Sequence, residues 1–140
     1  MEFALFGESF MDVRAVESKE YNYARYQYVT AILHRLGISP GVPGFYYLRD
    51  AVLFAYDLGE PVPEIGDLIF AEVIRSHRIE KRKMERAIRS VLESLARTMT
   101  RKQILRIITN LEVDCGNKPF KNLEFISYMV EALRMHFMGE

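Results

Sequence analysis

The sequence predicts an all-α fold, an orthogonal bundle of amphipathic helices joined by short connections. Apolar side chains recur at every third or fourth position along most of the chain, which places them on one face of an α-helix. Glycine, proline and polar clusters interrupt these periodic segments at the intervals that separate helices in globular proteins. Short connectors of this kind favour helices that pack directly on one another.

The first two predicted helices each end at a glycine. A helical apolar spacing runs from Tyr21 to Leu36 and stops at Gly37, and a second runs from Phe45 to Leu58 and stops at Gly59. Glycine frequently takes the left-handed conformation that ends a helix, and the prolines that follow cannot continue one. The inward side chains of the first helix are expected to be Tyr28, Val29, Ile32, Leu33 and Leu36.

Two helices with a tight connection are predicted between Glu64 and Arg97. The first runs from Glu64 to Ser76, and only a few polar residues around His77 to Glu80 separate it from the second. The expected inward side chains are Ile65, Leu68, Ile69, Phe70 and Val73 in the first helix, and Met84, Ile88, Val91, Leu92 and Leu95 in the second. A pair of this kind is the pattern of a helix-turn-helix.

Two more helices are predicted in the last third of the chain. Thr100 can cap a helix that reaches Leu111, and a turn-rich loop from Asp114 to Lys121 leads to a last helix from Asn122 to Phe137. The expected inward side chains are Ile104, Leu105, Ile107 and Ile108 in the first of these, and Phe125, Ile126, Met129, Val130, Leu133 and Phe137 in the second.

The N-terminal residues follow neither a helical nor a strand period. We therefore divide the chain into an extension of uncertain structure, residues 1–20, and one domain, residues 21–140. The first 28 residues are rich in Phe, Tyr and aliphatic side chains, which is too apolar a composition for a solvated disordered arm. We expect this segment to pack on the bundle or to meet the same segment of a second chain.

Positive charge is concentrated between Arg75 and Arg106. This segment has eleven Lys and Arg against three Glu, a net charge of +8, although the whole chain is neutral. The polar side chains that lie opposite the apolar stripe of the second helix in the pair are Arg82, Lys83, Arg86, Arg89, Ser90 and Arg97. Few acidic residues are spaced to neutralise them, so the chain is expected to have a face that attracts a polyanion, the alternative being an ordinary solvated helix face.

Three motifs carry a family resemblance. They are Leu33 to Ile38 with Gly44 to Ala51, then Met84-Glu85-Arg86-Ala87-Ile88-Arg89, and then Lys118-Pro119 with Glu124 to Ile126 and Leu133-Arg134. Their residues and order resemble the C-terminal DNA-binding domain of the stage-zero sporulation protein A family of response regulators. That family's recognition helix has Val-Glu-Arg-Ala-Ile-Arg at the matching place. The likeness covers the chain from about Tyr28 onward and implies the fold and the activity of that domain.

The chain also departs from this family. The family's effector domain is preceded by a phosphoacceptor receiver domain, and we expect none here, because fewer than thirty residues stand ahead of the match. In the turn, Arg78 to Arg82 stands where the family has an Asn-Thr-Thr-Ala-Ser run, so the Ser and Thr caps of the recognition helix are lost. Ser90 replaces a His, and one extra residue lies between Pro119 and Glu124.

The resemblance implies a transcription regulator that binds double-stranded DNA sequence-selectively. Arg86 and Arg89 are the base-reading candidates, because the planar fork of Arg can donate two hydrogen bonds to guanine. Glu85 matches a family residue that contacts DNA, although a structural pairing with Arg82 or Arg89 is the alternative. The candidates for contacts to phosphate are Lys81, Arg82, Lys83, Ser90, Arg97, Arg101 and Lys102.

Other partners follow from the same resemblance. A homodimer through the last helix or the N-terminal extension is one expectation, and a contact with RNA polymerase is another. The alternative function is that of an interaction protein, which pairs with a full-length sporulation-type regulator and antagonises it. Arg49, in the Tyr-Leu-Arg-Asp motif, is expected to form a structural ion pair.

Enzyme chemistry has little support in the sequence. His34, His77 and His136 are scattered, and no serine has the setting of a nucleophile, so we expect no catalytic residue, no cofactor and no metal. Cys115 is the only cysteine, which excludes an internal disulfide and fits a reducing cytoplasm. No signal peptide or membrane span is predicted. The expected location is the bacterial cytoplasm, on the nucleoid when the protein is bound to DNA.

Overall fold

The computed structural model describes residues 13–111 and 116–137, with side chains from residue 22 onward. Its helices are α1 (Val13–Arg35), α2 (Pro43–Leu58), α3 (Gly66–His77), α4 (Lys81–Thr98), α5 (Arg101–Thr109) and α6 (Asn122–Phe137), and a short 3-10 helix, η1 (Val62–Glu64), precedes α3. These described residues contain no β-strand. The predicted all-α fold is confirmed.

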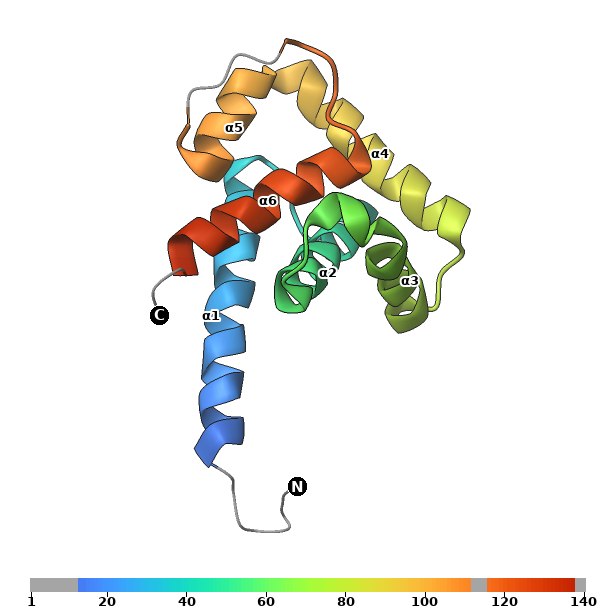
Figure 1. Ribbon diagram of the computed structural model, residues 1–140. Helices are drawn as coiled ribbons and strands as arrows, with labels where there is room; N and C mark the ends of the chain where they lie inside the picture. The colour runs from blue at the N-terminus through green and yellow to red at the C-terminus, as the bar shows by residue number, and fades with distance from the viewer. Residues whose placement is uncertain (1–12, 112–115, 138–140) are drawn as a thin grey trace.

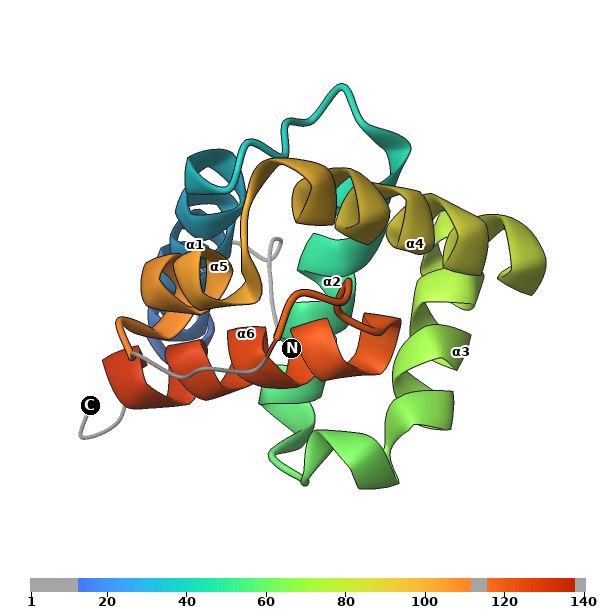
Figure 2. The same cartoon turned by 90° about the horizontal axis from the view of Figure 1, so that it is seen from above.

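The helix around which the others pack is α2. It contacts α1, α3, α4 and α6, and Figures 1 and 2 show it in the middle of the arrangement, with α4 and α6 crossing it. Phe45, Leu48 and Val52, which point from α2 into the core, are at most 1% exposed. Gly59 ends α2 in the left-handed conformation predicted for it, with φ 74°.

Most of the predicted inward side chains are buried. All those named for α4 and α6 are at most 6% exposed, and so are Val29, Ile32, Leu33 and Leu36 at the end of α1. Thr100 caps α5 as predicted: its Oγ1 accepts from the backbone N of Gln103, and the Gln103 side chain accepts from the backbone N of Thr100. Leu68 is an exception with 57% exposure, because α3 lies at the edge of the bundle and only its Ile69 and Val73 side meets α2 and α4.

The beginning of α1 and the end of α5 differ from the prediction. α1 begins at Val13 instead of Tyr21, and its first turns extend beyond the other helices (Figure 1). Apolar periodicity reports which face of a helix is buried, so a helical stretch that has no bundle behind it lacks this signal. α5 stops at Thr109 instead of Leu111, because Asn110 adopts a left-handed φ of 60°. Residues 1–12 of the predicted extension and residues 114 and 115 of the predicted loop lie outside the described residues.

Candidate nucleic-acid interface

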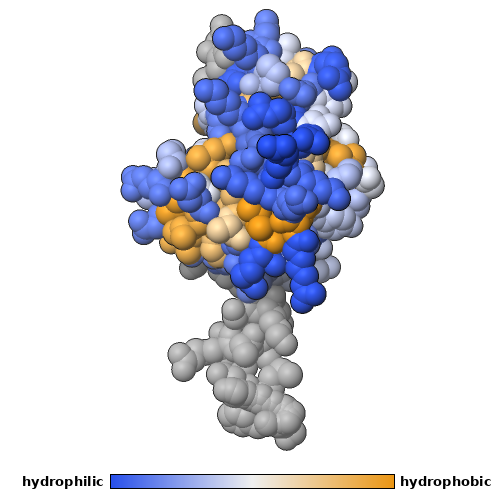
Figure 3. All heavy atoms as spheres, turned by 90° about the vertical axis from the view of Figure 1, so that its right-hand side faces the viewer, coloured by the Kyte–Doolittle hydropathy of each residue, from blue (hydrophilic) through white to orange (hydrophobic). Residues whose placement is uncertain are grey.

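The two faces of α4 differ sharply in exposure. The predicted apolar stripe is at most 5% exposed, whereas Lys81, Arg82, Lys83, Arg86 and Arg89 are all exposed. Figure 3 shows the side of the molecule that carries α3 and the beginning of α4, where hydrophilic side chains cover much of the surface and apolar patches lie between them. The buried stripe fixes the rotation of the helix, so the cations are held pointing away from the bundle.

The cationic side chains of α4 are not neutralised within the described part of the chain. The ion pairs found there join Arg25 to Asp57, Arg49 to Asp50, Arg75 to Glu72, and Arg101 to Glu124, and His77 contacts Asp50 as well. None of them involves a Lys or Arg of α4. The exposed face of α4 therefore presents concentrated positive charge, which attracts polyanions.

The N-terminus of α4 adds to this positive potential. Glu80 is the N-cap residue, and its side chain accepts no hydrogen bond from the helix, in agreement with the loss of caps read from the sequence. The first-turn N–H groups thus lack a side-chain partner, at the end of the helix where the backbone dipole is positive. Lys81, Arg82 and Lys83 occupy that same turn. An anion placed there would be stabilised by both the amides and the side chains.

The turn between α3 and α4 is short and fixed at its first residue. Arg78 ends α3 in the left-handed region, with φ 52° and ψ 52°, and its exposed side chain precedes the cations of α4. His77 Nε2 lies 2.7 Å from Asp50 Oδ2 on α2, and the ring of Tyr47 meets the imidazole edge-on. These contacts anchor the turn to α2. No local pattern in the sequence could join His77 to Asp50, since 27 residues separate them.

A glycine lets α2 and α4 approach closely. A Cβ added at Gly44 would lie 2.5 Å from Val91 Cγ2 and 2.8 Å from the backbone oxygen of Ala87. Backbone this close leaves no room for a side chain, so glycine is required for α4 to sit at this depth on α2.

Glu85 lies at the edge of the buried face. Its side chain is half-buried, and its backbone oxygen accepts a hydrogen bond from Asn122 Nδ2 at 3.4 Å, which links α4 to the start of α6. The pairing of Glu85 with Arg82 or Arg89 that the sequence left open does not occur among the described ion pairs.

The phosphate contact predicted for Arg101 is wrong for this structure. Arg101 is 8% exposed, donates to both carboxylate oxygens of Glu124, the shorter bond being 2.6 Å, and stacks over the ring of Phe120. It also donates to the backbone oxygen of Lys118. The arrangement clamps α5 to the start of α6, and the Arg101 guanidinium beside Glu124 holds the pKa of that carboxyl below its ordinary value.

The remaining candidates are exposed. Ser90 and Arg97 lie on α4 beyond the first turns, and Lys102 lies in the first turn of α5.

Arg49 forms the structural ion pair expected of it, with Nε 3.2 Å from Asp50 Oδ1, and its guanidinium covers the ring of Tyr26. In the described part of the chain, no three His, Cys, Asp or Glu side chains gather as a metal site would require, and no helix is both long and apolar enough to cross a membrane.

An α-helical bundle with a basic amphipathic helix on its surface is an arrangement found among helical DNA-binding domains. Residues 29–133 match the family model described as the C-terminal domain of the sporulation initiation factor Spo0A. The chain belongs to this family, which is one of DNA-binding regulators and not of enzymes. The resemblance inferred from the three sequence motifs is thus confirmed.

Proposed function

We propose that this protein is a transcription regulator that binds double-stranded DNA sequence-selectively through α4. The observation that carries the proposal is the exposed and unneutralised cationic face of α4, fixed in direction by a buried stripe on the opposite face. In a helix-turn-helix the second helix enters the major groove, and its first turns contact base edges. Under this proposal α3, the three residues 78–80 and α4 form the helix-turn-helix.

The side chains divide into two roles under this proposal. Arg86 and Arg89 lie about 60° apart on the outer face and read bases, while Glu85, at the edge of that face, can accept from a cytosine amino group. The phosphate contacts are Lys81, Arg82, Lys83, Ser90, Arg97 and Lys102, without the buried Arg101. Phosphate contacts add affinity and set the register of the protein on the duplex.

The decisive experiment is selection of DNA from a random duplex pool by the purified protein. Enrichment of a common sequence is expected, and a pool that stays random would contradict sequence selectivity. The affinity for an enriched duplex should then fall as the salt concentration rises. The five cationic phosphate contacts predict a slope of roughly −4 to −5 when the logarithm of the affinity is plotted against the logarithm of the salt concentration. A slope near zero would contradict contact with the DNA backbone altogether.

A homodimer through α1 is part of the proposal, because two half-sites raise the affinity of a small helix-turn-helix domain. The first turns of α1 extend past the bundle, and near them Tyr23 and Tyr26 are 61% and 40% exposed with stacked rings. The apolar side of α6 is already covered by this chain's own core. We therefore favour α1 over the last helix as the dimer contact. A contact with RNA polymerase stays a prediction.

A further inference from the structure

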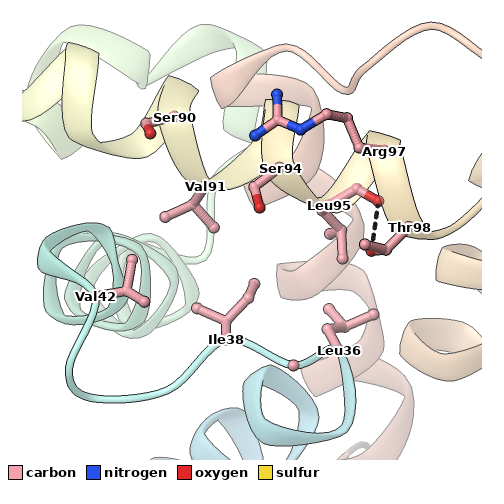
Figure 4. A pocket seen from close by; sticks show the side chains of 10 residues that line it. Leu36, Ile38, Val42, Ser90, Val91, Ser94, Leu95, Arg97 and Thr98 are labelled. Carbon is pink, nitrogen blue, oxygen red and sulfur yellow. Dashed lines mark hydrogen bonds between the residues drawn. The ribbon is translucent and has the colours of Figure 1, made fainter.

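A cleft runs along the flank of α4 that faces the connection from α1 to α2. Its volume is about 390 Å³, within the range of roughly 300 to 1,000 Å³ found for small-molecule sites. Its floor is formed by the aliphatic side chains Leu36, Ile38, Val42, Val91 and Leu95. Figure 4 shows Val91 and Leu95 pointing from α4 toward the three side chains of the connection.

The α4 rim of the cleft carries hydroxyl groups. Ser90, Ser94 and Thr98 are spaced four residues apart, so they lie along one flank of the helix, and all three line the cleft. Thr98 donates to the backbone oxygen of Leu95 at 3.1 Å. Among the described residues, the hydroxyls of Ser90 and Ser94 have no hydrogen-bond partner, so they are available to a bound molecule.

A single cation stands at this rim, and no acidic side chain lines the cleft. Arg97 forms no ion pair within the described part of the chain. In Figure 4 its guanidinium reaches back over Ser94, away from the C-terminal end of α4. The C-terminal end of α4 is the negative end of the helix dipole and would repel an anion. The Arg97 guanidinium points away from that end, so an anion bound to it avoids this repulsion.

We propose that this cleft binds a small aliphatic carboxylic acid. The carboxylate accepts from Arg97 and from the Ser90 and Ser94 hydroxyls. The alkyl chain lies along the half-buried Val42 and the edges of Ile38, Val91 and Leu95, each of which is at most 5% exposed. The occupant is small because the cleft follows α4 only from Ser90 to Thr98, a length of roughly 12 Å. One consequence rests on the proposed function: Arg97 is also a proposed phosphate contact, so a bound acid withdraws it from DNA.

Binding is tested first without DNA, by calorimetry with octanoate and with octanol as the uncharged analogue. Octanoate should bind at a single site and octanol at least about tenfold more weakly, because octanol offers no charge to Arg97. Arg97→Gln should lower octanoate affinity by at least about tenfold, and Ser94→Phe should abolish binding by filling the cleft. Lys118→Gln removes an exposed cation outside the cleft and should leave the affinity unchanged.

Several outcomes would overturn the assignment. They are an absence of binding at millimolar octanoate, equal binding of octanol, and equal loss of affinity in Arg97→Gln and Lys118→Gln. A short leucine peptide with a free C-terminus presents the same chemistry from a different source. Tighter binding of that peptide than of octanoate would overturn the small-molecule assignment in favour of a protein partner.

The link to DNA is measured separately, with sodium octanoate replaced by equal sodium chloride in the control. Saturating octanoate should weaken DNA binding several-fold and reduce the salt slope by about one contact, and DNA should weaken octanoate binding by the same factor. If octanoate binds but leaves the DNA affinity unchanged, the regulatory consequence is wrong. If octanoate binds as expected and no DNA is bound, the proposed function fails while the ligand site stands.

Discussion

Arg86 and Arg89 differ from the other exposed cations of α4 in their place along the helix. Lys81, Arg82 and Lys83 crowd the first turn, where the backbone amides also face solvent, whereas the two arginines lie one to two turns further on. The first group is suited to a phosphate at the groove edge. The arginines are suited to the base edges within it.

Arg86→Ala or Arg89→Ala should therefore weaken binding to a selected DNA site by about 1 to 3 kcal/mol and relax the preference at one base pair. Lys102→Ala should weaken binding to selected and random duplexes alike, because it removes a phosphate contact. Fluorescence anisotropy on the two duplexes measures both effects. Equal losses on both duplexes in all three variants would show that the base-reading side chains are misassigned.

The ion pair of Arg101 with Glu124 predicts a stability that depends on pH. The hydrogen bonds from Arg101 lower the pKa of Glu124 from its ordinary value of 4.5. A carboxyl whose pKa is lowered in the folded state contributes its stability above the ordinary pKa, and that contribution disappears as the pH falls through the folded value. The contribution is moderated because the Glu124 side chain is 36% exposed and partly screened by solvent.

Glu124→Gln should thus cost about 1 to 3 kcal/mol of unfolding free energy at neutral pH, since Arg101 stays buried without a charged partner. The difference between the two proteins should shrink below pH 4.5. Urea unfolding at a series of pH values measures it. A difference that stays constant down to pH 3 would mean that the carboxylate charge contributes nothing.

At the scale of elements, the depth at which α4 sits on α2 depends on Gly44. Two helices pack this closely only where one of them has no side chain, and here the backbone oxygen of Ala87 occupies the space that a Cβ would need. Gly66 is a useful contrast, because a Cβ there would lie 2.9 Å from Leu123 Cδ2, the end of a flexible side chain.

Gly44→Ala should destabilise the protein by about 1 to 3 kcal/mol through overpacking. It should also weaken DNA binding, because α4 must shift relative to α2. Gly66→Ala is the matched control and should change the unfolding free energy by less than about 1 kcal/mol, since Leu123 can rotate away. Urea unfolding compares the two variants. A Gly44→Ala protein as stable as the control would show that the helices separate without cost.

At the scale of the whole molecule, the first turns of α1, which extend beyond the other helices (Figure 1), require an explanation. An isolated helical segment of a few turns is marginal in water and gains its stability from packing. Removing the residues before Arg25 should convert a dimer into a monomer if α1 is the dimer contact. Light scattering measures the mass and thermal melting the stability. Unchanged mass and melting temperature would show that the segment contributes nothing to either.

The sequence by itself determined the helices and the amphipathic, basic nature of α4. The buried stripe from Met84 to Leu95, the cations opposite it, the Thr100 cap and the Gly59 stop are all local, because helical spacing and capping involve residues within a few positions of one another. The three motifs likewise sufficed to recognise the family that the match over residues 29–133 confirms.

Only the tertiary structure decided which side chains, predicted from the sequence to be exposed, are in fact buried. It also decided where the helices meet. Arg101 has the sequence neighbours of a surface cation, but Phe120 and Glu124, about twenty residues away, enclose it. The approach at Gly44, the bond from His77 to Asp50 and the cleft beside Arg97 likewise join segments distant in the chain. Burial depends on what packs against a side chain, and local periodicity does not specify that partner.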